Sequence, residues 1–404
     1  MSPVVKRFAA LLVLSVVAGL AATVGCGPDS KTKGKGQQAK PDAAKPDAPK
    51  PDAAKPDAPK PDEAKPEGAK PQAAEGVKKS ALLVDLPTDV CNTPDGMCLL
   101  PDGSVILSVP NFNEDQKLPP LLGKITKDNQ FEVFFKLPDN PDTKKPFGPL
   151  GVCVEPSGNL LVADFQQEGD RTSRVVRIVV KDGKPVEAVP VITGFHVSNA
   201  VVIRDGNLYV SETVIDAKAK PAVSGVMRFK LDELDGAKPV ALAEDELKDP
   251  HLLATITTDD EELPLGADGL CFDKEGNLYI GNFAGATVHK FVFDADGKVK
   301  ENTVFAKAPF MKSCDGLFFD PVKEVIYVAD SRANAIQVVT LDGRVSTLAA
   351  NGDTDGTDGG MDQPCEVLLR GRELIVSNMD WRVPGCINSG YNKPCTLSVI
   401  KLEE

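Results

Sequence analysis

The chain has 404 residues, 42% of them hydrophobic, which is enough for one large domain or two ordinary ones with a substantial core. Its formal net charge of −13 argues against a nucleic-acid-binding protein, which would normally present a basic face. The nine cysteines include no CxxC pair and the three histidines no HExxH motif, so a zinc ribbon or a histidine-rich metal site has little material.

The N-terminus has the pattern of a secretory signal. A basic start is followed by an apolar stretch from Phe8 to about Ala22 and by small residues before Cys26. The apolar stretch is short for a membrane span. Because TVGC resembles a bacterial lipobox, we expect residues 1–25 to be removed and Cys26 to be lipidated. The alternative is ordinary cleavage beside an unmodified cysteine.

Residues 27–79 form a low-complexity segment in which Lys-Pro recurs every five residues. Proline at this density excludes a helix and removes the donors that a sheet needs, so we expect a disordered, extended linker. From Lys40 to Gln72 it would reach on the order of 100 Å. An anchor followed by a linker predicts a domain tethered to the cell envelope, at the outer membrane or in the periplasm if the host has one, and otherwise secreted.

Six copies of one sequence frame follow from Thr93 onward. Each opens with a polar position near a glycine, continues with an apolar strand and a turn, and ends with a second strand. The copies are PDGMCLLPDGSVILSV, PLGVCVEPSGNLLVAD, SNAVVIRDGNLYVSE, ADGLCFDKEGNLYIGN, CDGLFFDPVKEVIYVAD and CEVLLRGRELIVSN. Their spacing suits a four-stranded unit, and no long helical pattern lies between them. We therefore predict an all-β fold, a six-bladed β-propeller over residues 80–404.

The last copy is one strand short of a complete blade. It offers only EVLL, ELIVSN and TLSVIKL before the chain ends, whereas the fifth copy offers four strand candidates. The segment SALLVDL, residues 80–86, lies ahead of the first copy and has no other partner. We predict that this N-terminal strand completes the sixth blade and removes an exposed sheet edge.

The frame DGLxFDxxGNLYVAD resembles NHL-type repeats. More specifically, it is similar to the six-bladed propellers of the gluconolactonase, senescence-marker-protein and paraoxonase group. The resemblance extends from Ser80 to Glu404. It implies a metal-dependent hydrolase that acts on a small-molecule lactone or related ester, and we expect a monomer that binds no nucleic acid.

The opening positions of the six copies would meet as a ring at one mouth of the propeller. They are Asp95, Leu150, Asn199, Asp268, Asp315 and Glu366. Carboxylates in one narrow space repel each other or take up protons, and Ca²⁺ removes this problem by accepting six to eight oxygen ligands. The resemblance implies Asp95, Asn199, Asp268 and Asp315 as metal ligands, and Glu366 would compensate for the short Asp95. The alternative is a set of Asp-Gly turns without an ion.

Two functions stay open. The resemblance implies a hydrolase in which the ion polarises a carbonyl and Asp315 acts as base or nucleophile. Paraoxonase-like members place a histidine at the blade-two position, where this chain has Leu150, and His196 is the only histidine close to the ring in sequence. The alternative is a non-catalytic propeller that binds a protein or another ligand at the cell surface, because fold does not decide function.

The cysteines are expected to differ in role. Three occupy the third position after the ring residue and are expected to be unpaired packing residues: Cys98, Cys153 and Cys271. Cys386 and Cys395 flank a loop with glycine and proline in an exported chain, so we predict a disulfide between them. A bridge between Cys314 and Cys365 is left open because geometry decides it, and Cys91 has no evident partner.

Overall fold

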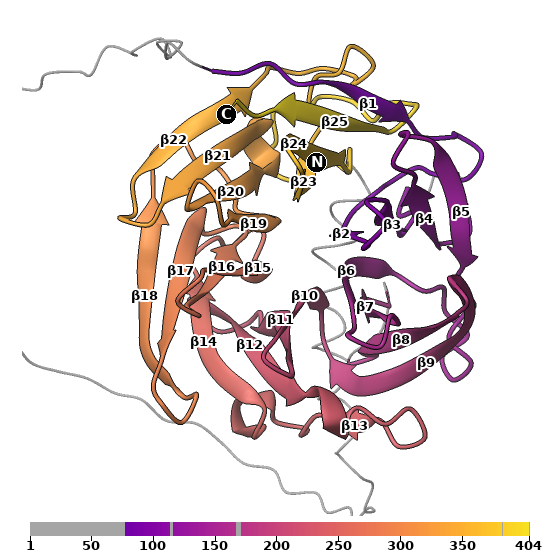
Figure 1. Ribbon diagram of the computed structural model, residues 1–404. Coiled ribbons are helices and arrows are strands. Elements are labelled where there is room, and N and C mark those ends of the chain that lie inside the picture. The colour runs from indigo at the N-terminus through magenta and orange to yellow at the C-terminus, as the bar shows by residue number, and fades with distance from the viewer. Residues whose placement is uncertain (1–76, 114–115, 167–170, 382, 404) are drawn as a thin grey trace, which may run out of the picture.

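The computed structural model describes residues 77–113, 116–166, 171–381 and 383–403. Its strands form six sheets around a common axis (Figure 1), which confirms the predicted six-bladed β-propeller. The predicted signal segment, the lipidation site at Cys26 and the linker up to residue 76 lie outside the described residues. Among the residues described, no helix has the length and apolarity needed to cross a membrane.

Each blade is a sheet of four strands that runs outward from the axis. Blade one comprises β2 (Met97–Leu99), β3 (Val105–Val109), β4 (Leu121–Ile125) and β5 (Phe131–Lys136). Blade two comprises β6 (Pro149–Val154), β7 (Leu160–Asp164), β8 (Ser173–Lys181) and β9 (Lys184–Phe195), with β13 (Val240–Ala241) added in parallel to β9. Blade three comprises β10 (Ser198–Arg204), β11 (Asn207–Asp216), β12 (Ala222–Lys230) and β14 (Leu252–Thr258).

The other three blades follow the same order. Blade four comprises β15 (Ala267–Phe272), β16 (Leu278–Asn282), β17 (Thr287–Phe293) and β18 (Val299–Lys307). Blade five comprises β19 (Leu317–Asp320), β20 (Val325–Asp330), β21 (Ala335–Thr340) and β22 (Val345–Ala350). Blade six comprises β23 (Pro364–Arg370), β24 (Glu373–Asn378), β25 (Thr396–Lys401) and β1 (Ala81–Asp85). Three short 3₁₀ helices are η1 (Leu231–Glu233), η2 (Glu246–Lys248) and η3 (Ser331–Ala333).

The sequence of each strand reflects its depth in the blade. The second strands are continuous apolar runs, and all five residues of β3 and of β7 are buried because neighbouring blades cover both faces. The outermost strand β18 carries Lys, Glu and Asn, and most of its side chains are exposed. The core is therefore a set of apolar layers between successive blades, and the innermost strands bring their polar opening residues to the axis.

The N-terminal strand closes the ring, as predicted. Strand β1 pairs antiparallel with β25, with Asp85 opposite Thr396, and the two lie side by side in Figure 1. The contact is packed by a hydrophobic group that we call the seam cluster: Leu86, Cys91, Met97, Val105, Leu107, Val109, Leu121, Ile125, Leu368, Ile375, Cys395 and Leu397. Lys78 also bridges Ala349, so the fold begins slightly before the predicted boundary at residue 80.

The predicted disulfide between Cys386 and Cys395 is not formed in this structure. Both thiols are free, as are the other six cysteines of the described chain. Cys395 is buried in the seam cluster, whereas Cys386 is half-buried and its thiol donates to the carbonyl oxygen of Asn388 at 3.6 Å. The two cysteines therefore lie in different surroundings. Cys314 and Cys365 are buried and unbridged.

Candidate functional site

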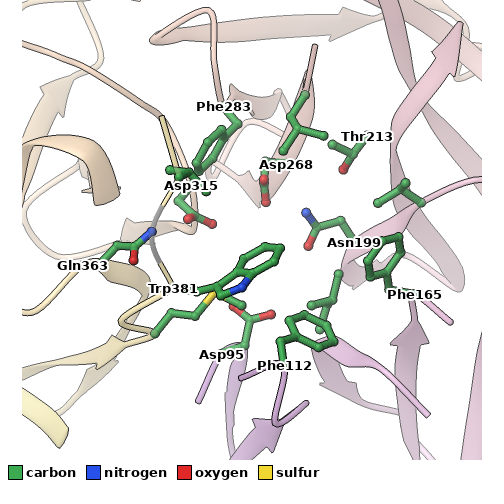
Figure 2. Close-up of a pocket in the computed structure, with 15 residues that line it drawn as sticks. Asp95, Phe112, Phe165, Asn199, Thr213, Asp268, Phe283, Asp315, Gln363 and Trp381 are labelled. Carbon is green, nitrogen blue, oxygen red and sulfur yellow. The ribbon is translucent and has the colours of Figure 1, made fainter. Parts of the chain in front are cut away.

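The polar opening positions of the repeats meet in one pocket. Five of the six ring residues line it: Asp95, Leu150, Asn199, Asp268 and Asp315. Figure 2 shows the three aspartate carboxylates and the Asn199 amide pointing into the same space. The cavity between these side chains is small, about 70 Å³, and it opens to solvent. Equivalent positions in sequence have thus become neighbours in space.

The glycines that follow ring residues set how closely the inner strands approach. A Cβ on Gly151 would lie 2.5 Å from the carbonyl oxygen of Asn199, and one on Gly269 would lie 2.4 Å from that of Asp315. Real Cβ atoms essentially never come within 3.0 Å of another heavy atom in this way. Glycine is therefore required because the backbones of adjacent blades touch here. The Asp-Gly pair therefore allows close packing of the inner strands, and Asp268 and Gly269 lie within strand β15 and not in a turn.

Glu366, the sixth ring position, does not line the pocket. Its Oε1 accepts the backbone N–H of Val367 at 2.8 Å, so the carboxylate bends back along its own strand. A Cβ on Gly316 would lie 2.2 Å from the same oxygen, which places the carboxylate against the inner edge of blade five. Its negative charge is still felt by the ring, because it contributes to raising the pKa of Asp268.

Asp95 and Asp268 are buried and Asp315 is half-buried, and among the described residues that line the pocket no cationic side chain balances them. Burial raises the pKa of Asp95 to about 6, although an interaction with the Cys365 thiol partly opposes the shift. Burial also raises the pKa of Asp268, as do the charges of Asp95 and Glu366, and it raises the pKa of Asp315, as do the charges of Asp268 and Asp95. The lining residues of the described chain include no lysine or arginine. The ring must therefore hold protons or a cation near neutral pH.

Asp315 has a hydroxyl partner beside the pocket. Ser331 Oγ donates to Asp315 Oδ2 at 2.6 Å, and the same hydroxyl lies 2.6 Å from the carbonyl oxygen of Pro364. This hydrogen bond lowers the pKa of Asp315. Burial and the charges of Asp268 and Asp95 outweigh it, so the pKa of Asp315 is raised overall.

The side chains of the ring offer the ligand atoms that calcium prefers, but these atoms lie far apart. Asp95, Asn199, Asp268 and Asp315 offer only oxygen ligands from the side chains that face the pocket, and hard divalent cations prefer oxygen. Within the described chain, no three ring acids have carboxylate oxygens that all lie within 4.8 Å of one another. Oxygens around one Ca²⁺ lie within about 5 Å of each other. The residues fit the ion in type and charge, but their spacing in this structure is wider than in a formed calcium site.

The walls of the pocket are apolar, which sequence reasoning missed. Their side chains are Phe112, Leu150, Phe165, Val197, Leu265, Phe283, Met379, Trp381 and Val383. The ring centroids of Phe112 and Trp381 are 5.4 Å apart, and those of Phe112 and Phe165 are 6.1 Å apart. A signal was present in the repeats: Phe165, Phe283 and Met379 directly follow the last polar residue of their frames. The residues at these equivalent positions therefore line the same pocket as the ring acids.

The polar residue that ends each frame has a structural role. Asp330 accepts the backbone N–H groups of Lys312 at 3.0 Å and Ser313 at 2.8 Å. Glu212 accepts those of Val197 at 2.7 Å and His196 at 3.0 Å. In each case the carboxylate holds the loop that leads into the inner strand of its own blade. These acids satisfy backbone donors of the loop that precedes their own blade and do not line the pocket.

A second acidic cluster lies beside the pocket. Within the described chain, His196, Glu212 and Glu246 are the histidine and acidic residues whose ligand atoms all lie within 4.8 Å of one another. His196 Nδ1 lies 2.7 Å from Glu246 Oε1, and Arg171 Nε lies 3.6 Å from the same oxygen. His196, the histidine nearest the ring in sequence, is therefore engaged in an ion-paired cluster and does not line the pocket.

Similar proteins share the fold of this chain. No family model matches the chain, and no curated protein sequence matches it. Among solved structures, a candidate gluconolactonase aligns with a TM-score of 0.51 at 15% identity over 83% of this chain and 99% of its own. A luciferin-regenerating enzyme aligns with a TM-score of 0.53 at 12% identity over 81% of this chain and 97% of its own. A candidate glucose dehydrogenase from Thermus thermophilus aligns with a TM-score of 0.52 at 16% identity over 80% and 99%. The chain therefore has the six-bladed β-propeller fold of gluconolactonase-like and related proteins, whose activities differ.

Proposed function

We propose that this chain is a calcium-dependent hydrolase of lactones or related esters, tethered outside the cytoplasm through Cys26. The observation that carries the proposal is the ring of oxygen donors from blades one, three, four and five at one pocket. Their positions match the ligand positions implied by the resemblance to the gluconolactonase group. The uncompensated negative charge of the ring supports a cation as its partner.

Asp95, Asn199, Asp268 and Asp315 would hold the ion. Bound there, Ca²⁺ would act as a Lewis acid toward a carbonyl oxygen in the pocket. Asp315 is the candidate for moving a proton, because its carboxyl faces the pocket and Ser331 Oγ fixes its Oδ2 at 2.6 Å. The loss of its proton would be favoured by a neighbouring positive charge.

The apolar walls of the pocket would determine which substrates bind. Aromatic and aliphatic side chains surround the acidic floor, so a neutral substrate with an apolar substituent would bury more apolar surface than a polyhydroxylated one. A carboxylate-bearing substrate would be repelled by the ring in the absence of the ion. We therefore expect lactones or esters with alkyl or aryl substituents.

The apolar walls also favour a second candidate, ligand binding without turnover. The blade-two ring position is Leu150, which lies among these walls where paraoxonase-like members carry a histidine. A propeller that only binds would use the same pocket for a hydrophobic small molecule or for a protruding side chain of a protein partner at the cell surface.

One experiment separates the two candidates. Purified protein is screened for hydrolysis of alkyl- and aryl-substituted lactones and aryl esters, with Ca²⁺, Zn²⁺ or EDTA. We expect turnover in calcium, its loss in EDTA, and its loss in Asp315→Asn but not in the matched variant Asp342→Asn, which lies outside the pocket. Absence of turnover with every substrate and metal would reject the hydrolase and leave the binding function.

The tether is tested separately. Wild-type protein in its native host should incorporate a labelled fatty acid and fractionate with membranes, and Cys26→Ala should do neither. Unchanged fractionation of Cys26→Ala, without label in the wild type, would reject the lipid anchor.

A further inference from the structure

Two cysteines meet where the propeller closes. Cys91 lies in the segment between β1 and β2, and Cys395 directly precedes β25. Both belong to the seam cluster, with exposed fractions of 0% and 3%. The two side chains are close enough in this cluster for the Cys395 thiol to add to the effect of burial in raising the pKa of Cys91. They are thus partners in space although almost the whole propeller separates them in sequence.

The backbone on both sides of the pair is fixed. The N–H of Leu86 donates to the carbonyl oxygen of Cys395 at 2.9 Å, and the N–H of Cys91 donates to that of Pro87 at 2.9 Å. The Tyr391 hydroxyl donates to the carbonyl oxygen of Asn92. These bonds tie the segment before β25 to the segment after β1. The backbones that carry the two cysteines are therefore held beside each other, as a disulfide between them requires.

We propose that Cys91 and Cys395 form a disulfide bond in the exported protein, and that this bond fastens the two ends of the propeller. The inference rests on the export proposed above, because disulfides persist outside the cytoplasm. It does not depend on calcium or on hydrolysis.

The oxidant would be a thiol–disulfide exchange protein of the envelope. The thiolate of one cysteine attacks the oxidant's disulfide and forms a mixed disulfide, and the thiolate of the other then displaces the oxidant. The pair loses two protons and two electrons and gains one S–S bond, while the oxidant's disulfide becomes two thiols. Because both sulfurs are buried in the folded chain, the exchange must occur before or during closure of the ring.

The bond would stabilise the closure of the propeller between its two ends. Closure depends on β1, a strand of five residues at the start of the domain. A covalent link between its following segment and the last strand encloses nearly the whole domain, and long loops give the largest entropic restriction of the unfolded chain. We expect reduction to lower the melting temperature of the oxidised protein by several degrees.

The test uses the full chain exported through its own signal and denatured in an alkylating reagent without reductant. Peptide mapping should find the Cys91 and Cys395 peptides joined and Cys386 alkylated. Alkylation of both Cys91 and Cys395 in exported, signal-cleaved protein would overturn the inference. If the chain is not exported, the proposed location fails, and refolding with oxidised glutathione then decides whether the same link forms. Failure to form it would overturn the inference.

Variants provide a second measurement. The double variant Cys91→Ala/Cys395→Ala should melt at the same temperature with and without reductant. The matched variant Cys98→Ala/Cys153→Ala, which alters two other cysteines of neighbouring inner strands, should keep the wild-type response. A reductant-sensitive melt in the first variant, or an insensitive melt in the wild type, would contradict the proposed bond.

Discussion

Asp95→Asn should have opposite effects on stability with and without calcium. In the absence of a cation, a neutral amide of the same shape removes the cost of burying the Asp95 charge and the repulsion that this charge exerts on Asp315. In the presence of Ca²⁺ the same substitution removes a charged ligand. We therefore expect Asp95→Asn to melt above wild type in EDTA at about pH 7.5 and below wild type in saturating calcium.

The size of the effect in EDTA follows from the shift of Asp95. Its pKa rises from 3.8 to about 6, so its contribution to stability is fully present below pH 3.8 and is lost as the pH rises through about 6. At about 1.36 kcal/mol per pKa unit, the complete loss is about 3 kcal/mol. About 1.4 kcal/mol of this falls between about pH 5 and about pH 7.5. For a domain of about 325 residues, that corresponds to roughly 2 °C in melting temperature.

The assay is a thermal melt of both proteins at several pH values, in EDTA and in millimolar Ca²⁺. The difference between their melting temperatures reports Asp95 together with its effect on Asp268 and Asp315, whose pKa values its charge raises. Calcium at a hundred times its Kd should stabilise the wild type by about 2.7 kcal/mol, or roughly 4 °C. A difference that did not grow with pH in EDTA would refute the assigned pKa, and the same order of the two proteins in calcium would refute the ion.

Further predictions concern the walls, the closure and the frame. Trp381 is the only tryptophan and lines the pocket, so an apolar lactone should change the intrinsic tryptophan fluorescence even in EDTA, and Trp381→Phe should remove the signal. Deletion of residues 80–86 should unfold or aggregate the protein, which a monomer with an unchanged melting temperature would contradict. Asp330→Ala should cost about 2–4 kcal/mol in the free energy of unfolding measured with denaturant, whereas the exposed Asp342→Ala should have little effect. Gly269→Ala should lower both the melting temperature and its response to calcium, because its Cβ meets the Asp315 carbonyl oxygen.

The repeats made the ring predictable because equivalent positions of a closed array must meet. Six frames implied six blades, and the strand missing from the last blade implied that residues near 80–86 complete it. The same logic brought Asp95, Asp268 and Asp315 into one pocket. It held because the result depends on register within a blade and not on the length of the connecting loops.

The features that the sequence analysis missed depend on local contacts that no repeat encodes. Glu366 occupies a ring position, but its carboxylate accepts the N–H of Val367 and turns away from the pocket. Cys395 lies near Cys386 in sequence, yet its partner in space is Cys91, because closure brings the two ends of the domain together. Trp381 lies in a loop after β24 and outside the repeated frame. Its position in the pocket wall therefore could not be predicted from the repeats.

Most frames have a polar residue at each end, and the groups around these residues decide their roles. The acid that ends the frame, as at Asp330, faces backbone N–H groups that stabilise its charge. The acid that opens the frame, as at Asp95, faces other acids across the axis. Removing the first leaves buried donors without an acceptor, whereas neutralising the second relieves repulsion when no cation is bound. The sign of the stability change in EDTA therefore separates the two roles. If substitution of an acid stabilises the protein without calcium and destabilises it with calcium, the acid is a calcium ligand and not a structural residue.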